Sequence, residues 1–100
     1  MDKVLQLLSL AQRAGKVASG EFMTEEAVKS GQAYLAVVAT DASDNTKKKF
    51  KNMCDFYNVP IIEYSVKEEL GHYIGKEFRA SLAVTDNGLA TKILSEYEDN

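Results

Sequence analysis

The feature that most constrains the fold is the alternation of short apolar runs with segments of helical periodicity. Residues 34–39, Tyr-Leu-Ala-Val-Val-Ala, form an apolar run, which is typical of a strand covered on both faces. Further candidate strands occupy residues 17–19, 61–64 and 80–85. Strands that alternate with helices predict an α/β fold. We therefore expect a three-layer α/β/α sandwich with a mixed four-stranded sheet.

Two predicted helices end at glycines. The first ends at Gly15, a usual residue just beyond a helix C-cap, and has an apolar stripe of Val4, Leu7, Leu8 and Ala11. The second runs from Gly20 to Ser30 and ends at Gly31. We expect either Phe22 or Met23 to face inward, which leaves the other available for stacking on a base.

Three further helices follow the loop 40–45. The third carries an apolar stripe of Phe50, Met53, Cys54 and Tyr57. The segment Ser65–Glu68 matches a capping box, in which a serine oxygen and a glutamate satisfy free N–H groups at a helix start. Asp86 is placed to cap the last helix.

Composition bounds the class of protein. The chain has 100 residues, is 45% hydrophobic and contains one proline, so we expect a single domain over residues 1–100. No apolar run is long enough to span a membrane, and we expect a cytoplasmic protein. The net charge of −3 is a poor overall match for nucleic acid, so a basic surface must be local.

The start of the second helix is the first candidate site. Free N–H groups and the positive end of the helix dipole favour an anion there, yet the side chains are Glu21, Phe22, Met23 and Glu26. Ligands in open α/β sheets bind beyond the strand ends. At that edge we expect the following residues to converge with Gly20: Lys16, Lys47, Lys48, Lys49, Arg79 and Ala80.

The residues do not indicate catalysis. His72 is the one histidine and has no neighbouring nucleophile in the sequence, and Cys54 falls on an apolar stripe that favours a buried, inert thiol. Neither a dinucleotide-binding nor a P-loop glycine motif is present. Asp41 and Asp44 are explained as caps, so we expect no catalytic residue, metal or cofactor.

The chain resembles a known family. Across residues 4–94 it is similar to the ribosomal-protein family that recognises kink-turn RNA, the archaeal L-seven-A-e type, and to its small bacterial YlxQ-like branch. The matching segments are Gln12–Lys16, Gly20 with Thr24, Ala27–Gly31, Leu35–Ser43, Asn58–Pro60, Lys67–Gly71, Ile74–Lys76 and Ala80–Val84. The resemblance implies an RNA-binding, non-catalytic α/β/α protein that uses the second helix's start and the loop before the last strand.

The family's helix opening has the pattern Gly-x-Asn-Glu/Gln-x-x-Lys, of which only Gly20 is present here. Phe22 stands at the asparagine position, Met23 at the Glu/Gln position and Glu26 at the lysine position. The resemblance assigns the first two positions to sheared G·A pairs and the lysine to phosphates. Loss of the amide and reversal of the charge predict a mode altered from standard kink-turn recognition.

Three functional hypotheses follow. The leading one is an RNA-binding accessory or ribosomal protein of the translation machinery, which binds structured RNA, first of all ribosomal RNA, and neither DNA nor membrane. The alternative is a protein-interaction module, with a ribosomal or translation-factor partner, that kept the fold and lost kink-turn binding. The third is a binder of a small ligand or nucleotide at the same helix start.

Overall fold

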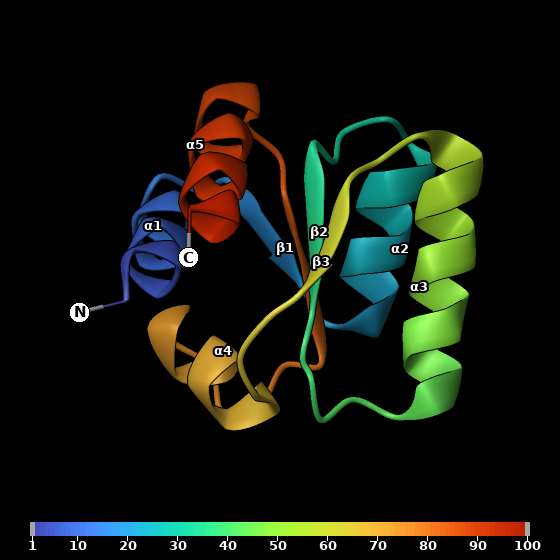
Figure 1. Cartoon of the computed structure of the whole chain (residues 1–100), viewed down its shortest axis with the longest axis horizontal. Helices are drawn as coiled ribbons and strands as arrows, with labels where there is room; N and C mark the ends of the chain where they lie inside the picture. Colours follow the sequence, from blue (N-terminus) through green and yellow to red (C-terminus); the bar gives the residue numbers. More distant parts are fainter. Residues whose placement is uncertain (1, 100) are drawn as a thin grey trace.

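The computed structural model describes residues 2–99, and strands alternate with helices through most of this range (Figure 1). In chain order the elements are α1 Lys3–Arg13, β1 Val17–Ser19, α2 Glu21–Lys29, β2 Leu35–Val38, α3 Asp44–Tyr57, β3 Ile61–Glu63, α4 Lys67–Tyr73, β4 Ser81–Val84 and α5 Asn87–Glu98. The predicted element order is confirmed.

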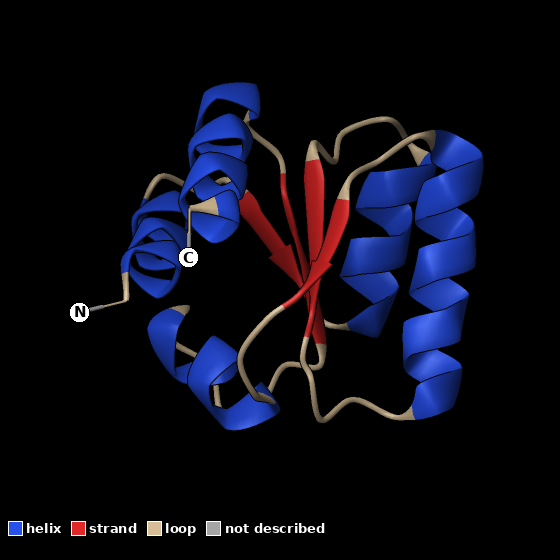
Figure 2. Cartoon of the chain, in the orientation of Figure 1, coloured by secondary structure: helices blue, strands red, loops and turns tan. Residues whose placement is uncertain are grey.

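The sheet has the strand order β1-β4-β2-β3 (Figure 2). β2 and β3 pair in parallel, whereas β4 runs antiparallel to both β1 and β2. The antiparallel β4 brings its first residue, Ser81, to the edge where β1 and β2 end. The mixed four-stranded sheet is therefore as predicted.

Helices cover both faces of this sheet (Figure 1). α1, α4 and α5 lie on one face, and α2 and α3 lie on the other. Every residue of β2 and β4 is buried, as expected for strands sandwiched between two helical layers. This confirms the α/β/α sandwich.

The sheet face under α2 is built from small side chains. Ala36 and Ala83 pack there with Ala27 and Val28 of α2 and with Cys54 of α3. On the opposite face, the larger side chains Leu35 and Leu82 pack in one core with Leu8 of α1 and Ile93 of α5. Small side chains on both surfaces allow α2 to pack closely on β4, so its start is held by the sheet as well as by its own turn.

Two predicted apolar stripes need correction. Phe22 and Met23 are both exposed, at 70% and 51%, and the inward residue of that turn is Thr24. Its hydroxyl donates to the Gly20 carbonyl at 2.6 Å and accepts from the buried Ser81 hydroxyl at 3.2 Å. Tyr57 is also exposed, and its ring packs edge-on against Phe56.

The predicted capping box before α4 is wrong. Ser65 adopts a left-handed backbone and bonds Glu69, and the N-cap residue Val66 has no side-chain cap. Instead, the Lys67 N–H donates to Asp41 Oδ1 at 2.9 Å. Asp41 belongs to the loop after β2, so the cap of α4 comes from a distant part of the sequence. By contrast, Asp86 caps α5 as predicted.

Replacement of Thr24 by valine should destabilise the fold. The substitution keeps the branched shape but leaves the buried Ser81 hydroxyl without its acceptor. A buried polar group without a partner costs about 1–3 kcal/mol. Urea unfolding followed by circular dichroism should show a free energy of unfolding lower by about that amount.

Thr91 provides the matched control. Its hydroxyl makes the same bond to the carbonyl four residues earlier, Asn87, but on the exposed side of α5. Thr91→Val should change the free energy of unfolding by no more than about 0.5 kcal/mol. Equal losses in the two variants would contradict a special role for the buried pair.

Candidate nucleic-acid interface

The start of α2 is the only helix start in residues 2–99 without a side-chain hydrogen-bond acceptor. Asp2, Ser43 and Asp86 cap α1, α3 and α5, and Asp41 accepts from the first turn of α4. The N-cap of α2 is Gly20, whose φ of 92° suits glycine and which has no side chain to offer. The first N–H groups of α2 therefore remain available to an external oxygen.

The loop before β4 lies beside this helix start. The Gly20 N–H donates to the Ser81 carbonyl at 3.0 Å, and the Ala39 N–H donates to the Ala80 carbonyl at 2.8 Å. Arg79 Nε donates to Ser19 Oγ at 3.2 Å. The expected convergence of Gly20, Arg79 and Ala80 at one sheet edge is thus confirmed.

Gly71 in α4 determines how closely this loop approaches. A Cβ atom at Gly71 would collide with the Glu77 carbonyl and the Phe78 backbone nitrogen. The loop is further tied to α4 by bonds from Lys76 N–H to the Gly71 carbonyl and from Arg79 N–H to the Lys67 carbonyl. We did not identify the packing role of Gly71 from the sequence, although a glycine inside a helix is a recognised signal of close packing.

Exposed apolar side chains surround the helix start. Phe22 and Met23 line a shallow hollow beside α2 together with Glu26. Phe78, from the loop before β4, is 60% exposed. Flat and flexible apolar groups next to free N–H donors suit a base or sugar that is not stacked in a helix.

The lysine cluster of α3 is largely neutralised. Lys47 and Lys51 pair with Glu63 at 3.4 and 2.8 Å. Lys49 pairs with Glu21 and Glu25, both at 3.2 Å. Hydrogen bonds from Lys29 and Lys49 hold the pKa of Glu25 below its usual value, and those from Lys51 and Lys47 lower the pKa of Glu63. These lysines are committed to carboxylates rather than free for phosphates.

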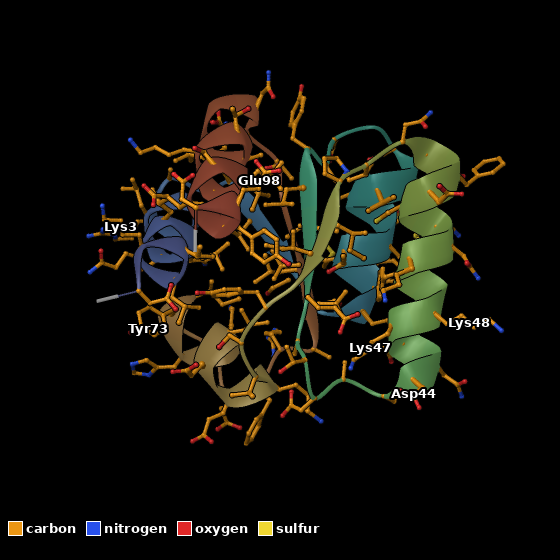
Figure 3. The ribbon with its side chains drawn as sticks, in the orientation of Figure 1. Lys3, Asp44, Lys47, Lys48, Tyr73 and Glu98 are labelled. Carbon is orange, nitrogen blue, oxygen red and sulfur yellow. The ribbon has the colours of Figure 1, made fainter. Side chains whose placement is uncertain are left out.

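The remaining charged candidates lie in different places. Lys48 is exposed, points away from the sheet (Figure 3) and forms none of the ion pairs described for residues 2–99. Glu26 is exposed beside Phe22 and Met23. Lys16 does not reach this edge: its carbonyl accepts from Thr85 N–H at the opposite end of β4. The expectation that Lys16 joins the site is therefore wrong, because β1 separates it from Gly20.

The residues considered for catalysis lie apart. Cys54 is buried, and burial raises its pKa to about 11. His72 is exposed on α4 and its ring contacts Tyr73 edge-on. Within residues 2–99, no three His, Cys, Asp or Glu side chains are grouped so as to hold a metal ion. Over the same range, every helix is too short or too polar to cross a membrane.

Comparison with known families identifies this arrangement. Residues 2–94 match the Ribosomal protein L7Ae/L30e/S12e/Gadd45 family. The chain belongs to this family. It is 44% identical over 89 residues to "RNA-binding protein YlxQ" of Bacillus subtilis (strain 168), with 89% of each chain covered. It is 41% identical over 91 residues to the protein of the same name from Enterococcus faecium, with 91% of this chain and 87% of the relative covered.

Two solved structures share the fold of this chain. A protein of unknown function from Bacillus halodurans C is 35% identical, with a TM-score of 0.94 over 98% of this chain and 99% of the other. A 15.5kD RNA binding protein from Giardia lamblia has a TM-score of 0.81 over 95% of this chain and 84% of the other, at 20% identity. The second likeness concerns the fold alone.

Replacement of Gly71 by alanine should destabilise the family fold in this chain. An ordinary Gly→Ala change within a helix stabilises it by up to about 1 kcal/mol. Here the new Cβ would collide with the backbone of residues 77–78, and overpacking of this kind costs about 1–3 kcal/mol. Thermal unfolding should show a lower melting temperature for Gly71→Ala.

Gly88 in α5 is the control. A Cβ at that position meets only the Asp86 carboxylate, at 3.4 Å, which is ordinary contact. Gly88→Ala should leave the melting temperature unchanged or raise it. A gain of stability in Gly71→Ala would show that the loop before β4 does not need a glycine at position 71 to pack against α4.

Proposed function

We propose that residues 1–100 form one non-catalytic RNA-binding domain of an accessory or ribosomal protein of the translation machinery. Its ligand is structured RNA, first of all ribosomal RNA, and the protein binds this RNA in the cytoplasm. Membership of the family and the names of the YlxQ relatives support RNA binding. The observation that carries the proposal is the uncapped start of α2 beside Arg79 and the exposed Phe22 and Met23.

The proposed mode combines three kinds of contact. The free N–H groups after Gly20 donate to a phosphate or a base oxygen. Arg79, fixed by Ser19 and by the Phe78 carbonyl, lies at the same edge and supplies positive charge. Phe22 and Met23 pack on an unpaired base. Of the candidate site residues, this proposal uses Gly20, Glu21, Phe22, Met23, Glu26, Arg79 and Ala80. Lys47 can reach a phosphate only by giving up its ion pair with Glu63, and Lys48 points away from the sheet.

We further propose that the mode differs from standard kink-turn recognition. Phe22 presents no amide to a guanine edge, and Met23 presents neither a carboxylate nor an amide. Glu26 is an exposed carboxylate where a cation would favour phosphates. Glu21 is turned toward Lys49 by an ion pair, so its charge is partly offset at this edge.

The alternative is a protein-interaction module. The observation in its favour is that two exposed apolar side chains, Phe22 and Met23, have Glu21, Glu25 and Glu26 around them. An apolar centre with a polar rim also suits a ribosomal or translation-factor protein partner. The same RNA-binding experiment separates the two proposals.

The chain should bind structured RNA with a steep salt dependence and little preference for an intact kink-turn. The probes are a kink-turn RNA, the same RNA with its G·A pairs disrupted, and an unrelated hairpin, measured by fluorescence anisotropy across a KCl series. The triple variant Phe22→Asn, Met23→Glu, Glu26→Lys should gain preference for the intact kink-turn. Each restored base contact contributes about 1–3 kcal/mol of discrimination.

Asp55→Lys controls for the charge reversal alone, because Asp55 is exposed near the end of α3, away from the proposed site. Any change in affinity should be the same for all three RNAs, so that no preference for the intact kink-turn appears. Absence of salt-sensitive binding to every RNA would overturn the RNA-binding proposal and favour a protein partner. A strong preference of the unaltered chain for the intact kink-turn would overturn the altered mode.

A further inference from the structure

The cations without a carboxylate partner gather on the helical layer opposite α2. Among residues 2–99, the lysines that form ion pairs all belong to α2 and α3, and they are Lys29, Lys47, Lys49 and Lys51. The arginine and lysines of α1 and α5 form none of these pairs. The accessible positive charge therefore lies largely away from the lysine cluster that the sequence singled out.

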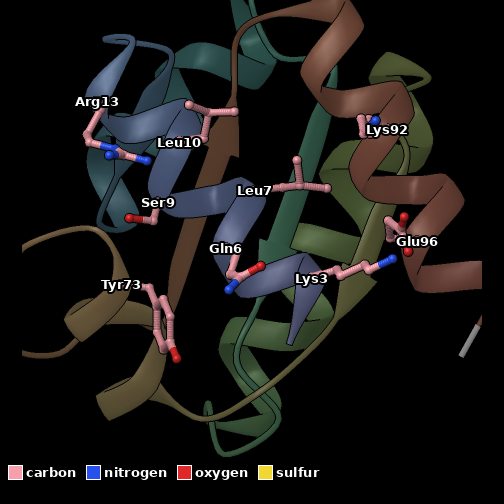
Figure 4. A pocket seen from close by; sticks show the side chains of 9 residues that line it. All are labelled: Lys3, Gln6, Leu7, Ser9, Leu10, Arg13, Tyr73, Lys92 and Glu96. Atoms are coloured by element: carbon pink, nitrogen blue, oxygen red, sulfur yellow. The ribbon is translucent and has the colours of Figure 1, made fainter. Parts of the chain in front are cut away.

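Three of these cations line one groove between α1 and α5, which we call the α1/α5 groove (Figure 4). Lys3 and Arg13 come from α1 and Lys92 comes from α5, and all three are exposed. The ring of Tyr73, from α4, lies at one side, and Glu96 is the one carboxylate in the lining. The groove has a volume of about 560 Å³.

A second hollow extends this groove. It shares Arg13 and Tyr73 with the first and adds Lys76 and His72. The two hollows together present four cations against one carboxylate, in a chain whose net charge is −3. Such a local excess attracts a polyanion although the chain as a whole does not.

Carboxylates separate the groove from the start of α2. A third hollow extends from Tyr73 to Phe78 and is lined by three carboxylates, Glu68, Glu69 and Glu77, together with His72 and Lys76. An RNA strand that followed the surface continuously from α2 to the groove would pass over these carboxylates. Two separate contacts with one rigid RNA avoid them.

The dimensions allow both contacts at once. The longest extent of the molecule is 32 Å, and an RNA arm, which is an A-form helix, reaches a comparable length after about one turn. A helical arm that leaves the α2 edge is therefore long enough within about one turn to reach the α1/α5 groove.

We propose that the α1/α5 groove binds the phosphate backbone of a helix that flanks the RNA structure held at the start of α2. The proposal rests on the RNA binding proposed above. Lys3, Arg13 and Lys92 contact phosphates, which position the RNA without reading its sequence. Because these cations give up no ion pair of their own, phosphate contacts form without breaking internal interactions.

The test compares two double variants that each remove two positive charges from the full chain. Arg13→Gln with Lys92→Gln alters the groove, and Lys29→Gln with Lys51→Gln alters the opposite layer. The probes are a labelled kink-turn RNA with long helical arms and the same RNA with both arms cut short, in a KCl series. Circular dichroism checks that each variant is folded.

The groove variant should bind the long-armed RNA roughly tenfold more weakly, and its salt-dependence slope should fall by about two. It should bind the short-armed RNA as the unaltered chain does, and the control variant should bind both RNAs as the unaltered chain does. Glu96→Gln should strengthen binding of the long-armed RNA, a gain that misfolding does not produce.

Equal weakening in both double variants, or no weakening in the groove variant, would overturn the proposal while RNA binding at α2 stands. Equal affinity of the unaltered chain for long-armed and short-armed RNA would overturn it as well. Failure of the unaltered chain to bind either RNA would count against the proposed function itself and so also against the groove.

Discussion

A buried hydroxyl pair joins the start of α2 to the start of β4. Thr24 bonds back to the Gly20 carbonyl and accepts from Ser81, while the Gly20 N–H donates to the Ser81 carbonyl. Both hydroxyls are buried, so the bonds are satisfied only in this arrangement. The rest of this edge depends on the hydroxyl pair. Arg79 and Ala80 come immediately before Ser81 in the sequence. Phe22 and Met23 come immediately before Thr24. A hydroxyl at position 24 thus turns its two apolar neighbours toward solvent.

Ion pairing then determines which charges remain available. Glu21, Glu25 and Glu63 neutralise most of the α3 lysine cluster, and each pair joins α3 to another element, α2 or β3. The α1/α5 groove has no comparable supply of carboxylates beyond Glu96. The densest run of lysines in the sequence lies on α3, whereas the accessible positive charge in the fold lies on the opposite helical layer, in the α1/α5 groove. We propose that a flanking RNA helix exploits this asymmetry.

Much of the fold could be predicted from the sequence because it depends on local patterns. The apolar run at residues 34–39, the glycines that end α1 and α2 and the cap at Asp86 each act within a few residues. Two errors arose where contacts between residues distant in the sequence determine the local structure. Asp41 rather than Ser65 supplies the cap of α4, and Thr24 faces inward because Ser81 lies opposite it. Lys16 was misplaced because the length of β1 separates it from Gly20.

We propose that RNA contacts the chain at the start of α2. Amide chemical shifts measured by NMR during titration with a structured RNA test it most directly, since the free N–H groups themselves are observed. We expect the largest changes at Glu21, Phe22 and Met23, accompanied by changes at Arg79 and Ala80. Unchanged shifts at these five amides, in a titration in which other amides respond, would contradict it.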